Sequence, residues 1–227
     1  MSSDDEVDRE ILLPGDEIEE TDLKPGKGMF KKDGKIYAAR LGVKRVRSGY
    51  ANVAAQSGRY EPQEGEKVIG TVTDINSSFW MVDVNAPNPA VLHVNDVPWM
   101  VDYGDTASYI DVGDAVLVKI TSVDEQNKMQ VTMDEEGLKK LSDGQVLEIA
   151  PAQVPRVIGR GGSMISMLKK YTDCKIFVGQ NGRIWISGDI EGQYLAAKAI
   201  KMIEENAQAI GLTDIVKEFL EENTDRF

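Results

Sequence analysis

The stretch Val157–Leu168, VIGRGGSMISML, places three glycines and an arginine between two apolar runs. After the glycines, Met164, Ile165 and Leu168 recur at the spacing of one helix face, and the preceding run Val154–Ile158 predicts a second, short helix. The glycines therefore form a turn between two helices. Backbone amides there lie beside a space that no Cβ fills, which suits a phosphate group.

The surrounding sequence predicts the element order β-α-α-β-β-α. Strands are predicted over residues 145–149, 174–178 and 183–187, and a long helix follows from Ile190 to near Gly211. The last two strands meet at an Asn-Gly pair, which favours a hairpin. A mononucleotide P-loop would need Gly-Lys-Ser/Thr, and a dinucleotide loop would follow a strand, so neither fits this setting.

Loop and element order together resemble the KH module, whose Gly-x-x-Gly loop clamps about four nucleotides of single-stranded nucleic acid. The alternative to an RNA clamp is a purely structural turn that joins two helices. The resemblance implies an RNA clamp made by Arg156, Ile158, Gly159, Arg160, Gly161 and Gly162. A Gly-x-Asn-Gly hairpin, with Gly179, Asn181 and Gly182, is expected to be structural.

Five runs upstream of this module predict the strands of a small barrel. Alternation with period two marks residues 67–75 and 80–84, and further apolar runs cover 90–94, 115–120 and 129–133. Five strands over some seventy residues suit a closed OB-type barrel. The runs GEKVIGTV (65–72) and DVGDAVLVKI (111–120) resemble an S1 domain, a frequent RNA-binding version of that fold.

The S1 resemblance implies an RNA-facing surface on the second and third strands. Phe79 or Trp80 and His93, the only histidine, would stack on bases, with Lys119 as a basic residue on the strand path. Trp80 alternates with Val82 and Val84, so a place in the core is the alternative for this residue. His93 has no thiol or second imidazole beside it in the sequence, and we expect no metal site and no cofactor.

Charge is segregated along the chain. The net charge is -12, yet residues 1–23 carry ten acids and one base whereas residues 24–60 carry ten bases and one acid. Such a protein does not coat nucleic acid with its whole surface, because nonspecific binding depends on phosphate neutralisation. Single Cys174 excludes an internal disulfide, and no apolar run approaches the length of a membrane helix. We expect a cytoplasmic protein without a membrane partner.

We therefore expect a multidomain chain, mostly β with an α/β part. The expected divisions are a small N-terminal β domain (1–60), an S1 domain with an OB-fold barrel (61–137), a type I KH domain with a long C-terminal helix (138–211) and a helical tail (212–227). The N-terminal part has turn signals between short apolar stretches, and its thin core suggests that it leans on a neighbour or partner.

This order of domains, with the turn Leu13-Pro14-Gly15-Asp16, resembles the S1/KH cap subunits of the RNA exosome in their short archaeal form. The resemblance implies single-stranded RNA as one partner and a ring of six RNase PH-like subunits as the other. Three caps of one or mixed kind would sit on the ring, with the N-terminal domain docked and the S1 domains around the pore that leads to 3'-to-5' degradation.

We expect no catalysis from the chain itself. One histidine and one cysteine in different modules cannot form a nucleophilic pair. Two alternatives stay open. A transcription elongation or antitermination factor also orders S1 before KH, although such proteins usually carry two KH modules and only sixteen residues follow Gly211. A purely structural ring cap is the other.

Overall fold

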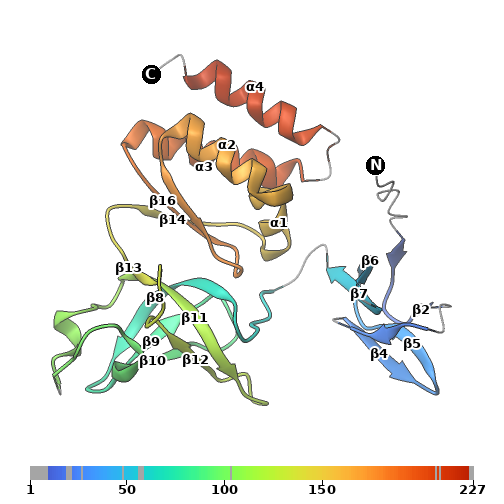
Figure 1. Ribbon diagram of the computed structural model, residues 1–227, viewed down its shortest axis with the longest axis horizontal. Helices are drawn as coiled ribbons and strands as arrows, with labels where there is room; N and C mark the ends of the chain where they lie inside the picture. Colours follow the sequence, from blue (N-terminus) through green and yellow to red (C-terminus); the bar gives the residue numbers. More distant parts are fainter. Residues whose placement is uncertain are drawn as a thin grey trace. The chain divides into compact units, whose positions relative to one another are not determined.

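The computed structural model divides into two compact units, residues 1–58 and 59–227 (Figure 1). The structure describes residues 10–18, 22–26, 28–47, 49–55, 59–102, 104–207, 209 and 211–224. Within these residues, no helix is long and apolar enough to cross a membrane.

The N-terminal unit is built from short strands, as the turn signals predicted. One sheet has the order β1-β6-β7-β3 and a second has the order β2-β5-β4. Its buried cluster is small and consists of Leu12, Ile18, Ile36, Ala38 and Val53. The strands are β1 (Ile11–Leu12), β2 (Glu17–Ile18), β3 (Lys24–Pro25), β4 (Met29–Lys32), β5 (Lys35–Ala38), β6 (Gly42–Arg47) and β7 (Tyr50–Ala55).

A closed barrel opens the second unit, and its strands match the five predicted runs. The sheet order is β12-β10-β9-β8-β11-β13, and β12 also pairs with β11, which closes the cylinder. Register shifts in β8 and β11 mark irregularities of the kind that bend strands around a barrel. The strands are β8 (Lys67–Ile75), β9 (Phe79–Asp83), β10 (Ala90–His93), β11 (Ala115–Val123), β12 (Met129–Thr132) and β13 (Lys139–Leu141).

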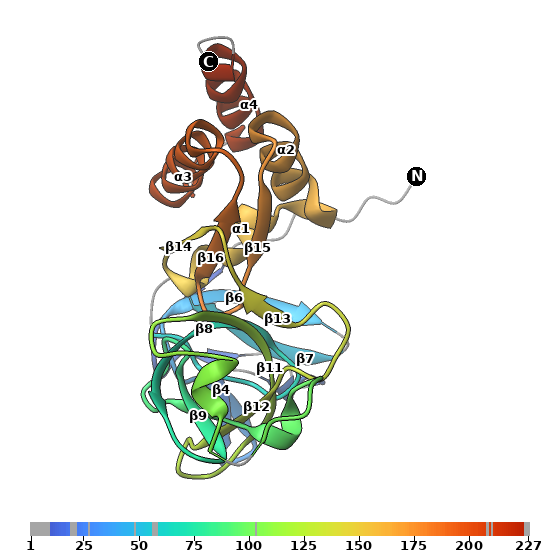
Figure 2. The ribbon, with the colours of Figure 1, turned by 90° about the vertical axis from the view of Figure 1, so that its left-hand side faces the viewer.

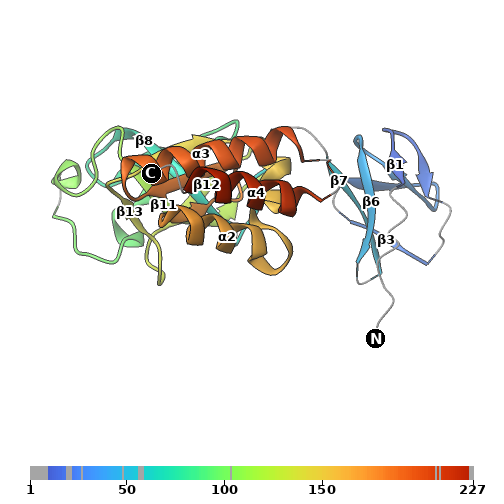
Figure 3. The same cartoon turned by 90° about the horizontal axis from the view of Figure 1, so that it is seen from above.

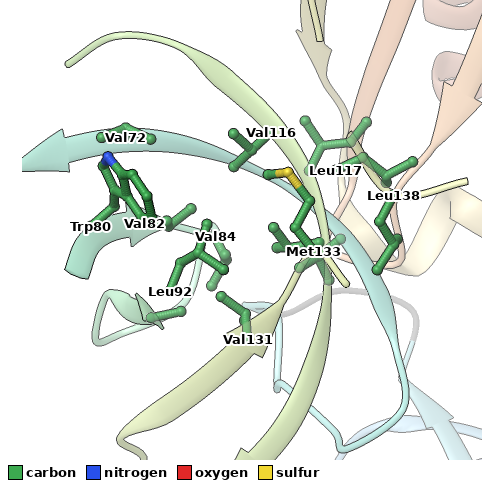
Figure 4. Close-up of a cluster of buried hydrophobic side chains, with 14 of the residues drawn as sticks. Val72, Trp80, Val82, Val84, Leu92, Val116, Leu117, Val131, Met133 and Leu138 are labelled. Atoms are coloured by element: carbon green, nitrogen blue, oxygen red, sulfur yellow. The ribbon is translucent and has the colours of Figure 1, made fainter. Parts of the chain in front are cut away.

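Alternating side chains of the barrel strands fill its interior (Figure 4). Trp80, Val82 and Val84 lie side by side in this core, together with Leu92 from β10 and Val131 from β12. Two short 3-10 helices, η1 (Val94–Asp96) and η2 (Thr106–Ser108), lie in the connection between β10 and β11.

The α/β domain that follows has the predicted order β-α-α-β-β-α, with one more helix. Its antiparallel sheet has the order β14-β16-β15. Helices α2, α3 and α4 contact one another and lie together when seen from above (Figure 3). The elements are β14 (Gln145–Glu148), η3 (Pro151–Gln153), α1 (Val154–Ile158), η4 (Arg160–Gly162), α2 (Ser163–Thr172), β15 (Lys175–Val178), β16 (Arg183–Ser187), α3 (Ile190–Glu205) and α4 (Leu212–Thr224).

Two elements extend past the domain limits expected from sequence. β13 begins beyond residue 137, yet it pairs with β11, so the barrel sheet continues to Leu141. α4 lies in the stretch expected as a helical tail, and its Leu212, Val216 and Leu220 are buried in the core of the α/β domain. The place of both elements is fixed by tertiary contacts, β13 through its pairing with β11 and α4 through its buried apolar face.

The sheet of the α/β domain lies between its helices and the barrel (Figures 1 and 2). Trp185 in the middle strand β16 is only 4% exposed, and its side chain belongs to the buried cluster of the barrel. Gly144 permits this approach, because a Cβ there would lie 2.4 Å from the Trp185 Nε1. The two domains are therefore packed against each other through a shared apolar contact.

Candidate nucleic-acid interface

The loop Gly159–Gly162, called the clamp loop below, joins α1 to α2 as predicted. α1 ends where Gly159 takes a φ of 75°, and Gly161 and Gly162 have φ values of 58° and 80°. These left-handed angles favour glycine over other residues. A Cβ on Gly159 would lie 2.7 Å from the Met164 backbone nitrogen, whereas nothing lies within 4 Å of the Cβ position of Gly161. Gly161 is thus bare backbone facing open space.

Basic and apolar side chains flank the clamp loop in the predicted way. Arg156 on α1 and Arg160 in the loop are exposed. Ile158, at the end of α1, is half-buried and packs against the core of the α/β domain. A group bound at Gly161 would therefore meet backbone and the helix α2 N-terminus, with guanidinium groups on the same segment.

On the barrel, the structure brings Phe79 and His93 together. They are directly opposite each other in the antiparallel pairing of β9 with β10, and both side chains are half-buried. Direct cross-strand neighbours share one face of a sheet, so the phenyl and imidazole rings form one surface. The His93 Nδ1 accepts a hydrogen bond from the Asn95 amide at 3.2 Å, which fixes the ring position.

Trp80 does not belong to this surface, and its prediction as an RNA-facing residue is wrong. Its side chain is fully buried in the barrel core, and its Nε1 donates a hydrogen bond to the Ile110 carbonyl oxygen at 3.0 Å. Successive side chains of a strand point to opposite faces, so a core position for Trp80 turns Phe79 outward. The apolar alternation with Val82 and Val84 was the signal for the core.

Lys119 lies on β11, and its ammonium group already forms a salt bridge with a carboxylate. Its Nζ is 2.5 Å from the Glu135 Oε1, and about a third of its side chain is exposed. Any phosphate at this position must compete with that carboxylate. The basic role predicted for Lys119 therefore carries an electrostatic cost that the sequence did not indicate.

The Gly179–Gly182 hairpin joins β15 to β16 and also reaches the barrel. Asn181 is completely buried, and its Nδ2 donates to the carbonyl oxygens of Ile69 at 2.7 Å and Val84 at 2.9 Å. A Cβ on Gly179 would lie 2.4 Å from the Asn181 Oδ1, and one on Gly182 would lie 2.4 Å from the Ile149 carbonyl oxygen. Both glycines are needed to let the hairpin enter this tight space.

Arg183 is a junction residue that sequence reasoning missed. Its guanidinium donates to the Asp83 Oδ2 at 2.6 Å and to the Glu148 Oε1 at 2.8 Å, so it links the barrel to the α/β domain. Burial alone would lower the pKa of Arg183, but its hydrogen bonds to these carboxylates and their negative charge outweigh burial and hold the pKa above its ordinary value. The arginine therefore stays charged at the junction. In the sequence, the only indication of this junction role was the position of Arg183 directly after a strong hairpin signal.

The surfaces on the two domains suit the parts of a single-stranded nucleic acid. A bare, basic loop at a helix N-terminus fits the sugar-phosphate backbone, and the half-buried rings of Phe79 and His93 fit the faces of bases. Among the residues that the structure describes, no group of three or more His, Cys, Asp or Glu side chains could hold a metal ion.

Comparisons with known proteins agree with this arrangement. A family model for the S1 RNA binding domain matches residues 61–134, and one for the KH domain matches residues 144–192. The exosome complex component Rrp4 of Thermoplasma volcanium is 44% identical over 215 residues, which is 94% of this chain and 91% of that protein.

Two further matches come from another genus and from a solved structure. The exosome complex component Rrp4 of Methanosarcina mazei is 42% identical over 214 residues, which is 94% of this chain and 82% of that protein. A crystal structure described as a candidate exosome complex RNA-binding protein is 38% identical, with a TM-score of 0.70, and covers 74% of this chain and 99% of its own.

Proposed function

The chain belongs to the family of the exosome complex component Rrp4, and from that premise we propose that it is a non-catalytic, RNA-binding cap subunit of an archaeal exosome. In this role it captures single-stranded RNA and feeds it into the pore of an RNase PH-like hexameric ring for 3'-to-5' degradation. Three such subunits, alone or mixed with a related cap, would sit on one ring, in the cytoplasm.

The clamp loop is the observation that carries the proposal. Gly159, Gly161 and Gly162 keep left-handed angles that expose backbone, and the position of Gly161 is open to an incoming phosphate. A loop that merely joined two helices would need no such open position. The Phe79 and His93 pair adds a second surface that can hold bases.

Tight packing between the S1 and KH domains supports capture of one strand by both. Asn181 and Arg183 of the KH domain hydrogen-bond to the barrel, so the two surfaces belong to one body. RNA that leaves the clamp can then meet the S1 face without an entropic cost for ordering two loose domains.

The N-terminal unit has the surface that a docking domain needs. Ile11 and Leu13 are 61% and 57% exposed although they flank the buried Leu12. Exposed apolar residues in one short segment indicate a partner surface. We assign this segment to the contact with the ring.

Substitutions at Gly161 test RNA capture. Both Gly161→Asp and Gly161→Asn fit the open space and tolerate a left-handed φ better than other residues, but only Asp places a negative charge where phosphate should lie. We expect Gly161→Asp to weaken binding of a fluorescently labelled single-stranded RNA at least about tenfold relative to Gly161→Asn, by anisotropy titration. Equal affinities of the two variants would favour the purely structural cap.

Partner identification tests the assembly. Affinity purification of the chain from its host, followed by mass spectrometry, should recover RNase PH-like subunits. Recovery of RNA polymerase instead would support the elongation or antitermination factor. The isolated chain should leave RNA at full length when incubated with phosphate, whereas shortening of the RNA would identify an enzyme.

A further inference from the structure

A row of apolar side chains crosses the KH sheet on its barrel-facing side. Val146, Trp185 and Phe177 are cross-strand neighbours on β14, β16 and β15. The barrel covers Trp185 in the middle of this row, but Phe177 on the edge strand β15 is 37% exposed. The rings of Phe177 and Trp185 have their centroids 6.0 Å apart and are tilted by 43°. Phe177 is thus an exposed ring that rests on a fixed, buried one.

Two lysines from different domains lie against this ring. The Lys139 Nζ, from β13 of the barrel, is 5.8 Å from the Phe177 ring centroid and 5.7 Å from that of Trp185. The Lys169 Nζ, from α2 of the KH domain, is 6.0 Å from the Phe177 ring centroid. β13 lies on the side of the barrel next to the KH sheet (Figure 2). The Phe177 ring therefore sits at the S1–KH junction between two ammonium groups.

Among the described residues, some lysines pair with acids, whereas others contact only aromatic rings, as Lys198 does on Tyr194. Lys119, Lys140 and Lys201 each form a salt bridge with a carboxylate. Within the described part of the chain, Lys139 and Lys169 contact aromatic rings and form no salt bridge. In a protein with a net charge of -12, two such cations beside one exposed ring are a local site for a polyanion.

We propose that Phe177, Lys139 and Lys169 form a stacking site for one nucleotide of single-stranded RNA, separate from the clamp loop. The base would stack on the Phe177 ring, and the ammonium groups would turn from the ring to the adjoining phosphates. Stacking platforms with basic neighbours are how single strands are held without sequence preference. Contacts between exposed cations and rings are weak enough to be exchanged for phosphate contacts.

The site lies outside the groups already assigned to RNA. Phe177 alternates with Ile176, which is buried in the KH core, so the ring lies on the sheet face away from that core. A nucleotide bound here would touch lysines of both domains at once. The inference rests on the proposed RNA-binding function and adds a third contact to it.

Three variants of the full chain test the site in the anisotropy assay. Phe177→Leu removes the ring but keeps an apolar cover over Trp185. The double variant Lys139→Gln/Lys169→Gln removes only the charges. Phe30→Leu is the matched control, because Phe30 is also an exposed ring, at 43%, and stacks on Tyr37 in the N-terminal unit.

We expect Phe177→Leu to weaken RNA binding by roughly 5- to 150-fold, the range for loss of one stacked base. The double lysine variant should lower the slope of log affinity against log salt concentration by up to about 1.4, since each phosphate contact of a single strand contributes about 0.7. Phe30→Leu should bind like the wild type. RNA carrying 4-thiouridine should crosslink to the peptide that contains Phe177.

Wild-type affinity and salt slope in both site variants, with no crosslink at Phe177, would overturn the site. If Gly161→Asp still weakens binding in that case, the proposed function stands and only this inference fails. If the wild-type chain binds no RNA, the proposed function itself fails. Loss of a protein partner from the lysine variant with RNA affinity unchanged would assign the patch to protein docking and overturn the site. The lysine variant keeps the test decisive even if Phe177→Leu lowers the melting temperature.

Discussion

Asn181 pairs with the backbone of Ile69 in the way a neighbouring strand would. Its Nδ2 donates to the Ile69 carbonyl oxygen at 2.7 Å, and its Oδ1 accepts from the Ile69 amide at 3.3 Å. The same Nδ2 also donates to the Val84 carbonyl oxygen at 2.9 Å. One KH side chain thus satisfies three buried backbone groups of the S1 barrel, which makes the hairpin a structural bridge between the domains.

Asn181→Ala should weaken that bridge strongly. It leaves the amide and carbonyl of Ile69 and the carbonyl of Val84 without the side-chain partner, and each buried polar group left unpaired costs about 1–3 kcal/mol. We expect a loss of about 3 kcal/mol in the free energy of unfolding, measured by urea titration. The S1 and KH transitions, followed by separate probes, should cease to coincide.

Asn88→Ala serves as the control for this change. The Asn88 Nδ2 also donates to two backbone carbonyls, those of Gln126 and Asn127, but these lie in an exposed turn where water can replace the amide. We expect a loss within about 0.5 kcal/mol. A similar cost for both variants would contradict the role of Asn181 at the junction.

A part of the site could be predicted where the residues that determine it lie close together in the sequence. The clamp loop followed from glycines at fixed offsets between two helical patterns, and the structure has the loop there. The roles of Asn181 and Arg183 at the junction depend on partners near residues 69 and 83, far away in sequence. A hairpin signal predicts the turn, but only tertiary packing shows what its side chains meet.

The choice between Phe79 and Trp80 shows a limit of family resemblance. The resemblance to S1 domains left both aromatic residues as candidates for the RNA-facing position. The alternation with Val82 and Val84 favoured a core position for Trp80. The structure follows the alternation. The Glu135 carboxylate on Lys119 could not be predicted, because the two residues meet only when the chain after β12 returns to β11.

Adjacent substitutions at Phe79 and Trp80 should give opposite results. Phe79→Ala removes a half-buried ring from the face that carries His93, so RNA affinity should fall by about 1–3 kcal/mol with little change in stability. Trp80→Phe removes the hydrogen bond to Ile110 and opens a cavity, so unfolding should become easier by about 1–3 kcal/mol while RNA affinity is kept. Calorimetry and anisotropy titration measure the two quantities, and loss of RNA affinity from Trp80→Phe alone would contradict the assignment.

Glu135→Gln should strengthen RNA binding. The Glu135 carboxylate neutralises Lys119, so its removal frees the ammonium group and also reduces repulsion of phosphate. We expect affinity to rise by about two- to fivefold at low salt, with the difference shrinking as salt is added. Glu136→Gln, a change at an exposed neighbour, is the control for general charge effects. An equal gain in RNA affinity from Glu135→Gln and Glu136→Gln would show that Lys119 does not contact the RNA.

Leu13→Asp should separate ring docking from RNA binding. Leu13 is 57% exposed, so the change should cost the isolated chain little stability, but a charge in an apolar contact is costly to desolvate. We expect RNase PH-like subunits to be lost from affinity purification while RNA affinity of the isolated chain is unchanged. Lys35→Ala, at an exposed salt bridge of the same unit, should keep the partners. Retention of the ring subunits by Leu13→Asp would place docking elsewhere.

Glu204 makes the KH domain sensitive to acid. Burial alone would raise the pKa of Glu204, but hydrogen bonds from the Lys201 ammonium and the Ala150 amide, each 2.7 Å long, outweigh it and hold the pKa below its ordinary value of 4.5. The folded state therefore gains stability from the ionised carboxylate above that value and loses it as the pH falls through the lower, folded pKa.

Glu204→Gln isolates this contribution. Glutamine keeps an oxygen that can accept from the Ala150 amide but has no charge to pair with Lys201. We expect the variant to be less stable than the wild type by about 0.5–1 kcal/mol at neutral pH. The difference should vanish below the folded pKa, where the wild-type carboxyl is also neutral. Urea unfolding across a pH series measures it, with Glu205→Gln at an exposed position of the same helix as the surface control. A difference that stays constant as the pH falls would show that shape rather than charge makes Glu204 stabilising.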